Sequence, residues 1–270
     1  MALRLAVVFP GQGTAGGGIW GEIHDTVQRV IGDSEMPYQV SVFANSVDAF
    51  ERLKEETAPD VVAGHSLGEY AAAYAAGCLE LEDGVRLVAE RDRLMARAAR
   101  ENPGGMVAII GAVTREIVEV VDTAGGTVVA ANFNTPRQTV ISGEKEALEA
   151  VAGRVNGKRR KLDVAGAFHS PLMQEAAVGM SKLLADVPLK DPVLSMLSGI
   201  DGGVLTKADE VRLALREQML SPVHWIAVVE QFAALGVEEV IEAGGGTLVR
   251  MLRDFEGLKM QGRTVKEVLA

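Results

Sequence analysis

Short apolar runs alternate along the chain with longer segments whose apolar side chains recur at helical spacing. The runs are typical of buried strands, and the periodic segments are typical of amphipathic helices. In the outer parts of the sequence, we expect strands at residues 3–9, 61–63, 193–197 and 237–243. We expect helices there at residues 20–31, 38–56, 81–99, 172–184, 211–220 and 228–235, and a further Ala-rich helix after residue 68. Strands that alternate with helices in this way predict an α/β fold with a parallel sheet.

The middle of the chain follows another order. Strands are predicted at residues 106–110, 127–132, 138–142 and 160–164, and helices at 114–124 and 144–155. This βαββαβ order is the ferredoxin-like arrangement, which closes a small sheet of its own. We therefore expect residues 105–164 to form an inserted ferredoxin-like subdomain, and residues 1–104 and 165–270 to form the main domain together.

Composition narrows the class of protein. Apolar residues make up 48% of the chain and charged residues 24%, as in ordinary globular proteins. No apolar run approaches the ~18 residues that a membrane span needs, and the first residues do not resemble a signal peptide, so we expect a cytoplasmic protein. A net charge of −10 argues against nucleic-acid binding. Cys78 is the only cysteine, which excludes an internal disulfide and a Cys-based zinc site, and we expect no metal.

A candidate nucleophile lies at residues 64–68, which read Gly-His-Ser-Leu-Gly. An apolar run precedes this motif and an Ala-rich helical pattern follows it, which is the context of a G-x-S-x-G nucleophile elbow. Glycines at both ends let strand and helix approach closely, so Ser66 would lie on a strained turn with its hydroxyl exposed. The following helix would point its first amides at an oxyanion. The alternative is a chance match to a short pattern.

A serine hydroxyl needs a base, and the chain has four histidines. His65 neighbours the serine, but adjacent strand residues point to opposite faces. His24 and His224 lie in or beside helical patterns. His169, in a loop that opens a helix, is therefore the best candidate. The third member of such a triad would be an acid between the serine and the histidine in the sequence. None of the aspartates there follows a strand of the main sheet convincingly, so a backbone or amide carbonyl could orient the imidazole instead. The aspartates considered are Asp83, Asp92, Asp122 and Asp163.

Arginines gather towards the end of the helix predicted at residues 81–99. Cations near a helix C terminus complement the helix dipole, so these side chains, taken singly, are expected to form a solvated face. They are Arg91, Arg93, Arg97 and Arg100.

Six motifs span nearly the whole chain. They are Phe-Pro-Gly-Gln-Gly at 9–13, Gly-His-Ser-Leu-Gly-Glu-Tyr at 64–70, Arg-Asp-Arg-Leu-Met at 91–95, Asn-Phe-Asn-Thr-Pro at 132–136, Gly-Ala-Phe-His-Ser-Pro-Leu-Met at 166–173 and Ser-Pro-Val-His-Trp at 221–225. With these motifs, and in this order, the sequence resembles the malonyl-CoA:acyl carrier protein transacylases. The resemblance implies an α/β-hydrolase-like core with a ferredoxin-like insertion.

The resemblance also implies a role for individual residues. Ser66 would carry the malonyl group as an ester, with His169 as general base. The backbone amides of Gln12 and Leu67 would form the oxyanion hole, and the backbone carbonyl of Gln218 would orient the histidine.

Other residues would bind the substrate. Arg91 would hold the malonyl carboxylate, because a guanidinium pairs with a carboxylate through two hydrogen bonds. Phe168 would narrow the pocket near the malonyl C2 atom and disfavour a methyl branch. Met95 and Gln39 would complete the substrate-binding residues.

The implied partners are malonyl-CoA and acyl carrier protein, with no cofactor and with a monomeric enzyme. Carrier proteins of this kind are acidic, so a basic segment is a candidate docking site; its alternative is a solvated strand end. The segment comprises Lys158, Arg159, Arg160 and Lys161. The pathway would be fatty acid or polyketide synthesis.

Two other functions remain open: a serine hydrolase that removes stalled acyl groups, and a noncatalytic module that binds carrier protein. A hydrolase of neutral acyl chains would gain nothing from Arg91 as a buried cation, which favours the transferase.

Overall fold

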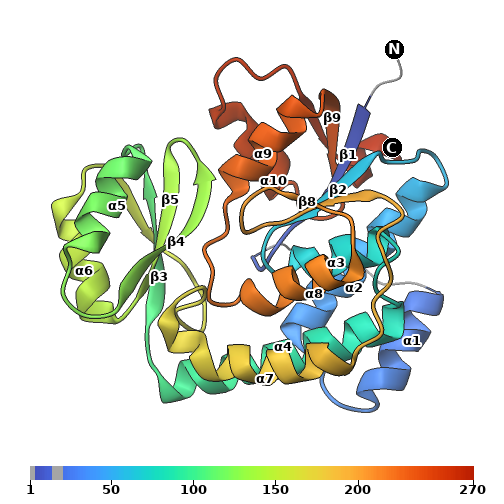
Figure 1. Cartoon of the computed structure of the whole chain (residues 1–270), viewed down its shortest axis with the longest axis horizontal. Helices are drawn as coiled ribbons and strands as arrows, with labels where there is room; N and C mark the ends of the chain where they lie inside the picture. Colours follow the sequence, from blue (N-terminus) through green and yellow to red (C-terminus); the bar gives the residue numbers. More distant parts are fainter. Residues whose placement is uncertain (1–3, 14–20) are drawn as a thin grey trace.

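A mixed, mainly parallel β-sheet forms the centre of the larger part of the molecule (Figure 1). The computed structural model describes residues 4–13 and 21–270. The strand order is β10-β9-β1-β2-β7-β8, and every neighbouring pair is parallel except β7 with β8. The strands are β1 (Arg4–Phe9), β2 (Val61–Gly64), β7 (Ser195–Leu197), β8 (Val204–Leu205), β9 (Val237–Glu242) and β10 (Gln261–Thr264). The predicted α/β fold is confirmed.

Helices cover both faces of this sheet, because successive residues of a buried strand point to opposite sides. Leu5, Val7 and Phe9 of β1 join an apolar cluster with helices α2, α3, α4 and α7. Ala6 and Val8 join a second cluster with α9 and α10. The helices outside the small sheet are α1 (Glu22–Ile31), α2 (Tyr38–Lys54), α3 (Gly68–Ala75), α4 (Leu81–Glu101), α7 (Gln174–Asp186), α8 (Ala208–Glu217), α9 (Trp225–Ala234), α10 (Thr247–Met251) and α11 (Val265–Val268), with short 3-10 turns η1 (Pro171–Met173) and η2 (Leu252–Asp254).

A second, smaller sheet lies beside the first and is drawn in green and yellow in Figure 1. Its order is β4-β5-β3-β6, and all neighbouring pairs are antiparallel. Its elements are β3 (Gly105–Ile110), α5 (Thr114–Asp122), β4 (Val128–Thr135), β5 (Gln138–Gly143), α6 (Lys145–Arg154) and β6 (Lys158–Lys161), which follow one another in the predicted βαββαβ order. Ile109, Ile117, Ile141 and Val151 form a core of their own between strands and helices.

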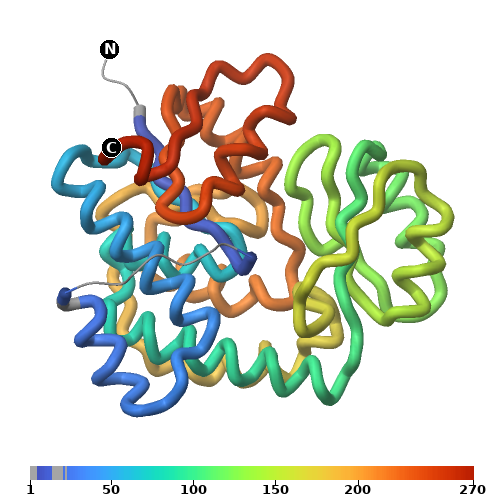
Figure 2. Tube along the Cα trace, turned by 180° about the vertical axis from the view of Figure 1, so that it is seen from behind, coloured from blue at the N-terminus to red at the C-terminus, as the bar shows by residue number. Residues whose placement is uncertain are grey.

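The two parts are joined by backbone contacts along β4. Val223, just before α9, donates its N–H to the carbonyl of Ala131 and accepts from the N–H of Phe133, both over 2.8 Å. Thr135 adds a hydrogen bond of 3.0 Å to Asp254. The view from behind in Figure 2 shows the small sheet beside the segment that leads to α9. Strand β4 is thus the edge of the small sheet that contacts the larger part of the molecule.

Several element boundaries differ from the prediction. Strand β6 occupies Lys158–Lys161 instead of residues 160–164, because the basic residues themselves pair with β3 and lie exposed at the sheet edge. Strand β7 begins at Ser195, and Val193, expected in it, is 78% exposed. Helix α1 begins at Glu22, and Trp20, with which the predicted helix began, lies outside the described residues.

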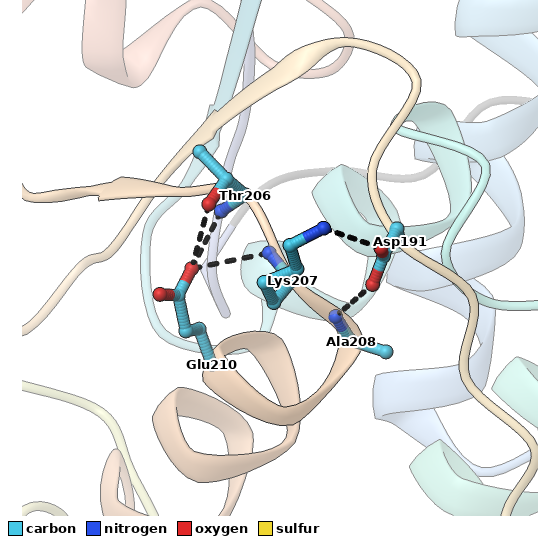
Figure 3. Close-up of polar contacts among 5 residues, drawn as sticks. All are labelled: Asp191, Thr206, Lys207, Ala208 and Glu210. Atoms are coloured by element: carbon cyan, nitrogen blue, oxygen red, sulfur yellow. Dashed lines mark hydrogen bonds and ion pairs between the residues drawn. The ribbon is translucent and has the colours of Figure 1, made fainter.

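Helix α8 begins at Ala208, three residues earlier than predicted, because side chains satisfy its first amides (Figure 3). Asp191 accepts the N–H of Ala208 over 2.8 Å. Glu210 turns back to accept the N–H groups of Thr206 and Lys207 over 2.7 and 3.1 Å. Such capping extends a helix beyond its apolar pattern.

Candidate active site

Ser66 lies on a strained turn between β2 and α3. Its φ angle is +53°, which a serine rarely adopts. A Cβ atom on Gly64 would come within 2.1 Å of the Glu69 nitrogen, and one on Gly68 within 2.0 Å of the Phe9 carbonyl oxygen. Both positions therefore require glycine, and strand and helix meet with only backbone between them. The turn has the geometry of a nucleophile elbow.

His169 lies within hydrogen-bond distance of this serine. Its Nε2 is 2.8 Å from Ser66 Oγ, and its Nδ1 lies 2.8 Å from the Gln218 carbonyl oxygen and 3.1 Å from that of Ser221. A carbonyl can only accept, so Nδ1 carries the proton and Nε2 is free to accept the serine proton. Two backbone carbonyls therefore take the place of the acid that the sequence did not supply.

The imidazole is kept neutral by its surroundings. Burial, and after it the charge of Arg91, lowers the pKa of His169 to about 4. His65 points elsewhere, since its Nε2 bonds the Asn134 side chain over 2.9 Å. His24 is exposed, and His224 stacks on Phe133. Among the four histidines, only His169 is therefore placed as a base for Ser66.

Arg91 is buried in the same place, with 1% of its surface exposed. Its Nη1 donates to Gln39 Oε1 over 2.5 Å, and its Nη2 donates to Gln218 Oε1 and to Ser66 Oγ, each over 3.1 Å. Burial lowers the pKa of this guanidinium. No carboxylate of the described residues forms an ion pair with it.

The expectation of a solvated arginine face is wrong for Arg91. It holds for Arg93 and Arg97, whose largely exposed side chains pair with Glu90 and Glu101 on the same helix. Arg91 instead belongs to the buried stripe of α4, one turn before Met95.

These groups line one cavity of about 580 Å³ between the two sheets. Ser66, His169, Arg91, Met95 and Phe168 contribute to its wall. Gln12, at the turn after β1, lines it as well, and Leu67 is buried just before α3. Gln39 does not line the cavity; it lies behind Arg91, with its amide nitrogen 3.5 Å from Met95 Sδ.

Comparisons with known proteins show the family to which the chain belongs. Residues 33–245 match the family model described as an acyl transferase domain. The malonyl CoA-acyl carrier protein transacylase of Haemophilus influenzae is 38% identical over 223 residues, which cover 79% of this chain and 72% of the relative. The chain belongs to the malonyl-CoA:acyl carrier protein transacylase family. The transacylase of Bacillus subtilis is 33% identical over 91% of this chain and 88% of its own. The structure of an acyl carrier protein S-malonyltransferase from Vibrio cholerae superposes with a TM-score of 0.90 at 30% identity, covering 99% of this chain and 100% of that one.

Within the transacylase fold, the basic segment Lys158–Lys161 forms the edge strand β6, and all four side chains are exposed. Of the four, only Arg160 also lines the cavity. The described residues hold no cluster of three or more His, Cys, Asp or Glu side chains arranged for a metal ion. None of the described helices is both long and apolar enough to cross a membrane.

Glu69 also belongs to this site, although the sequence motifs predicted no role for it. Although it is a carboxyl residue, it is 1% exposed and hydrogen-bonded to the side chain of Gln218. One signal was present in the sequence, because an acid stands alone in the otherwise apolar, Ala-rich helix α3.

Proposed function

We propose that this enzyme transfers a malonyl group from malonyl-CoA to the phosphopantetheine thiol of acyl carrier protein, for fatty acid or polyketide synthesis. The observation that carries the proposal is the meeting of Ser66, His169 and the unpaired buried cation Arg91 in one cavity. The serine and histidine supply acyl transfer, and the cation selects an acyl group that ends in a carboxylate.

In the first half-reaction, Ser66 Oγ attacks the thioester carbonyl while His169 Nε2 takes the hydroxyl proton. The backbone amides of Gln12 and Leu67 stabilise the oxyanion, one at the turn after β1 and one where α3 begins. The carbon–sulfur bond then breaks, and CoA leaves as a thiol with the proton from His169.

In the second half-reaction, the pantetheine thiol of the carrier protein gives its proton to His169 and attacks the ester of Ser66. The carbon–oxygen bond breaks, and the proton returns from His169 to Ser66 Oγ. The thioester supplies an already activated acyl group, so the transfer requires no cofactor.

The acyl preference follows from burial. Arg91 has lost its hydration, and its guanidinium nitrogens donate hydrogen bonds to the neutral oxygen atoms of Gln39, Ser66 and Gln218, so it gains most when a malonyl carboxylate enters. Phe168 narrows the wall beside His169 and disfavours a methyl branch at C2. A single methyl group is worth only ~1–3 kcal/mol, so this discrimination is incomplete.

Acyl carrier protein would dock at Lys158–Lys161. The chain carries a net charge of −10, so an acidic partner requires a local basic surface, and β6 provides an exposed one at the side of the cavity. A type II polyketide acyl carrier protein has been seen in complex with its malonyl-transacylase, a structure that superposes on this chain with a TM-score of 0.84 at 28% identity.

We also propose an architectural assignment: an α/β-hydrolase-like core from residues 1–104 and 165–270, and a ferredoxin-like subdomain from 105–164. The nucleophile elbow at the end of β2 supports the first part. The strand order β4-β5-β3-β6, with both helices packed into one core, supports the second. We also propose a cytoplasmic location and a monomeric state.

Labelled malonyl-CoA tests the proposal. We expect the label to move to acyl carrier protein in the presence of the enzyme, with little free malonate. Release of malonate at the rate of CoA release would instead indicate the hydrolase. A Ser66→Ala variant that still produces labelled carrier protein would contradict the proposed nucleophile.

A further inference from the structure

Glu69 is a buried carboxyl residue three positions after the nucleophile, on α3. Its Oε1 accepts the N–H of Gly199 over 2.7 Å, and its Oε2 accepts from Nε2 of Gln218 over 2.7 Å. The charged groups that face it are Arg91 on α4 and Asp201 in the turn after β7. Burial raises the pKa of Glu69 to about 8, which the Gly199 hydrogen bond and Arg91 oppose. Such a costly group is retained only where its acceptors are needed.

Gln218 contacts both His169 and Arg91. Its main-chain oxygen holds His169 Nδ1 over 2.8 Å, and its side-chain Oε1 accepts from Arg91 Nη2 over 3.1 Å. A glutamine amide has an acceptor at one end and two donors at the other. If the amide turned over, its NH2 group would face the guanidinium, and two donors would meet. The orientation of this one amide therefore decides whether Arg91 is held or displaced.

The contact with Glu69 determines that orientation. Both oxygens of Glu69 act as acceptors in this site: Oε1 accepts from the N–H of Gly199 and Oε2 accepts from the NH2 end of Gln218. The oxygen end of Gln218 must then point at Arg91. We propose that Glu69 is a positioning residue for acyl transfer, which acts through the Gln218 amide to hold Arg91 in the direction that meets a malonyl carboxylate. This inference rests on the proposed function.

Glu69→Gln is the sharpest test, because it keeps the size of the side chain and removes one acceptor. The new amide can satisfy either Gly199 or Gln218, but its NH2 end must then face a donor at the other. We expect kcat/KM for ester formation from malonyl-CoA to fall by about 10- to 100-fold, the range expected for one buried hydrogen bond that is left unmade. An acetyl group has no carboxylate for Arg91 to bind, so the rate of ester formation from acetyl-CoA should change less than about threefold.

Glu242→Gln is the matched control. Glu242 is fully buried and also accepts on both oxygens, from the N–H groups of Thr247 and Val249, but it has no contact with Arg91 or Gln218. A loss of activity that comes only from disturbing a buried carboxyl group should appear in both variants and with both acyl groups. Only Glu69→Gln should change the ratio of malonyl to acetyl rates.

Gln218→Met provides a second route if Glu69→Gln folds poorly, which its thermal unfolding midpoint would show. Gln218→Met keeps the main-chain carbonyl that holds His169 and removes the amide. It should lower the malonyl to acetyl ratio as Glu69→Gln does, and the double variant should be no worse than the single ones, since both act on one chain of hydrogen bonds.

An unchanged ratio in folded Glu69→Gln, or effects of the two substitutions that multiply in the double variant, would overturn the inference. Failure of the proposed function would look different, because the unmodified enzyme would then form no ester from malonyl-CoA.

Discussion

Replacing Arg91 by alanine separates binding of the acyl carboxylate from the acyl-transfer chemistry. The side chain contacts Ser66 Oγ but comes from α4, whereas Ser66 lies on the turn between β2 and α3. His169 keeps both of its carbonyl partners without it. The substitution therefore leaves a serine and a base and removes a cation that donates a hydrogen bond to Ser66 Oγ. Arg160 and Arg250 also line the cavity.

The size of the effect follows from burial. Hydrogen bonds to a charged group are worth ~1.5–3 kcal/mol each, and a guanidinium can offer two to one carboxylate. Since Arg91 is 1% exposed, solvent and salt screen the pair little. Allowing for the loss of its hydrogen bonds to Gln39 and Gln218, we take the lower part of the combined range, ~3–4 kcal/mol. That corresponds to a fall of about 10²- to 10³-fold in kcat/KM for malonyl-CoA.

The assay is ester formation on the enzyme from malonyl-CoA and from acetyl-CoA, each followed by release of CoA. Arg91→Ala should lose malonyl transfer and gain relative activity with acetyl groups. Arg93→Ala is the control, because Arg93 lies on the same helix but is exposed and paired with Glu90; both rates should stay within about twofold. An unchanged preference for malonyl in Arg91→Ala would refute the carboxylate clamp.

Four further outcomes are expected. His169 acts as a base only when neutral, and its pKa is lowered to about 4. In a pH profile, kcat/KM should therefore begin to fall only well below pH 6.5; a fall centred at pH 6.5 or above would contradict the assignment of His169 as the base. In Arg91→Ala this fall should move to higher pH, because Arg91 contributes to the lowering. Phe168→Ala should raise methylmalonyl relative to malonyl transfer by about 5- to 100-fold, with a constant ratio arguing against steric exclusion at C2. Reversing the charge of Lys158, Arg159 and Lys161 to Glu should raise KM for carrier protein, more at low salt, and leave ester formation from malonyl-CoA unchanged; an unchanged KM would place docking elsewhere.

Local patterns were enough to predict the nucleophile turn and the order of elements in the small sheet. Gly64 and Gly68 flank the serine between an apolar run and a helix, so the sequence alone predicts that the backbones of strand and helix approach closely. His169 could be selected because only four histidines were present and the others had a reason to point elsewhere.

The burial of Arg91 was indicated only by the family resemblance, although the helical pattern alone could have predicted it. Its position falls in the stripe formed by Val88 and Met95 on α4, at a spacing of three and four residues. A charged residue within an apolar stripe indicates a buried cation, and attention to the arginines as a series concealed it.

Other features depend on contacts that a local pattern does not contain. Glu69 and Gln218 meet across 149 positions of sequence. Strand β10 is short and exposed, so it carries no apolar run, and α10 is held by the carboxylate of Glu242 rather than by an amphipathic pattern. Strand β6 was displaced in the prediction because apolar residues were expected to form it, whereas at an exposed edge charged residues are well tolerated.

Intact-mass measurement of the enzyme after mixing with malonyl-CoA tests the central claim most directly. The account predicts one covalent malonyl adduct, located on Ser66 by peptide mapping, absent in Ser66→Ala and discharged when acyl carrier protein is added. An adduct that persists in Ser66→Ala, or transfer to carrier protein without any adduct on the enzyme, would contradict it.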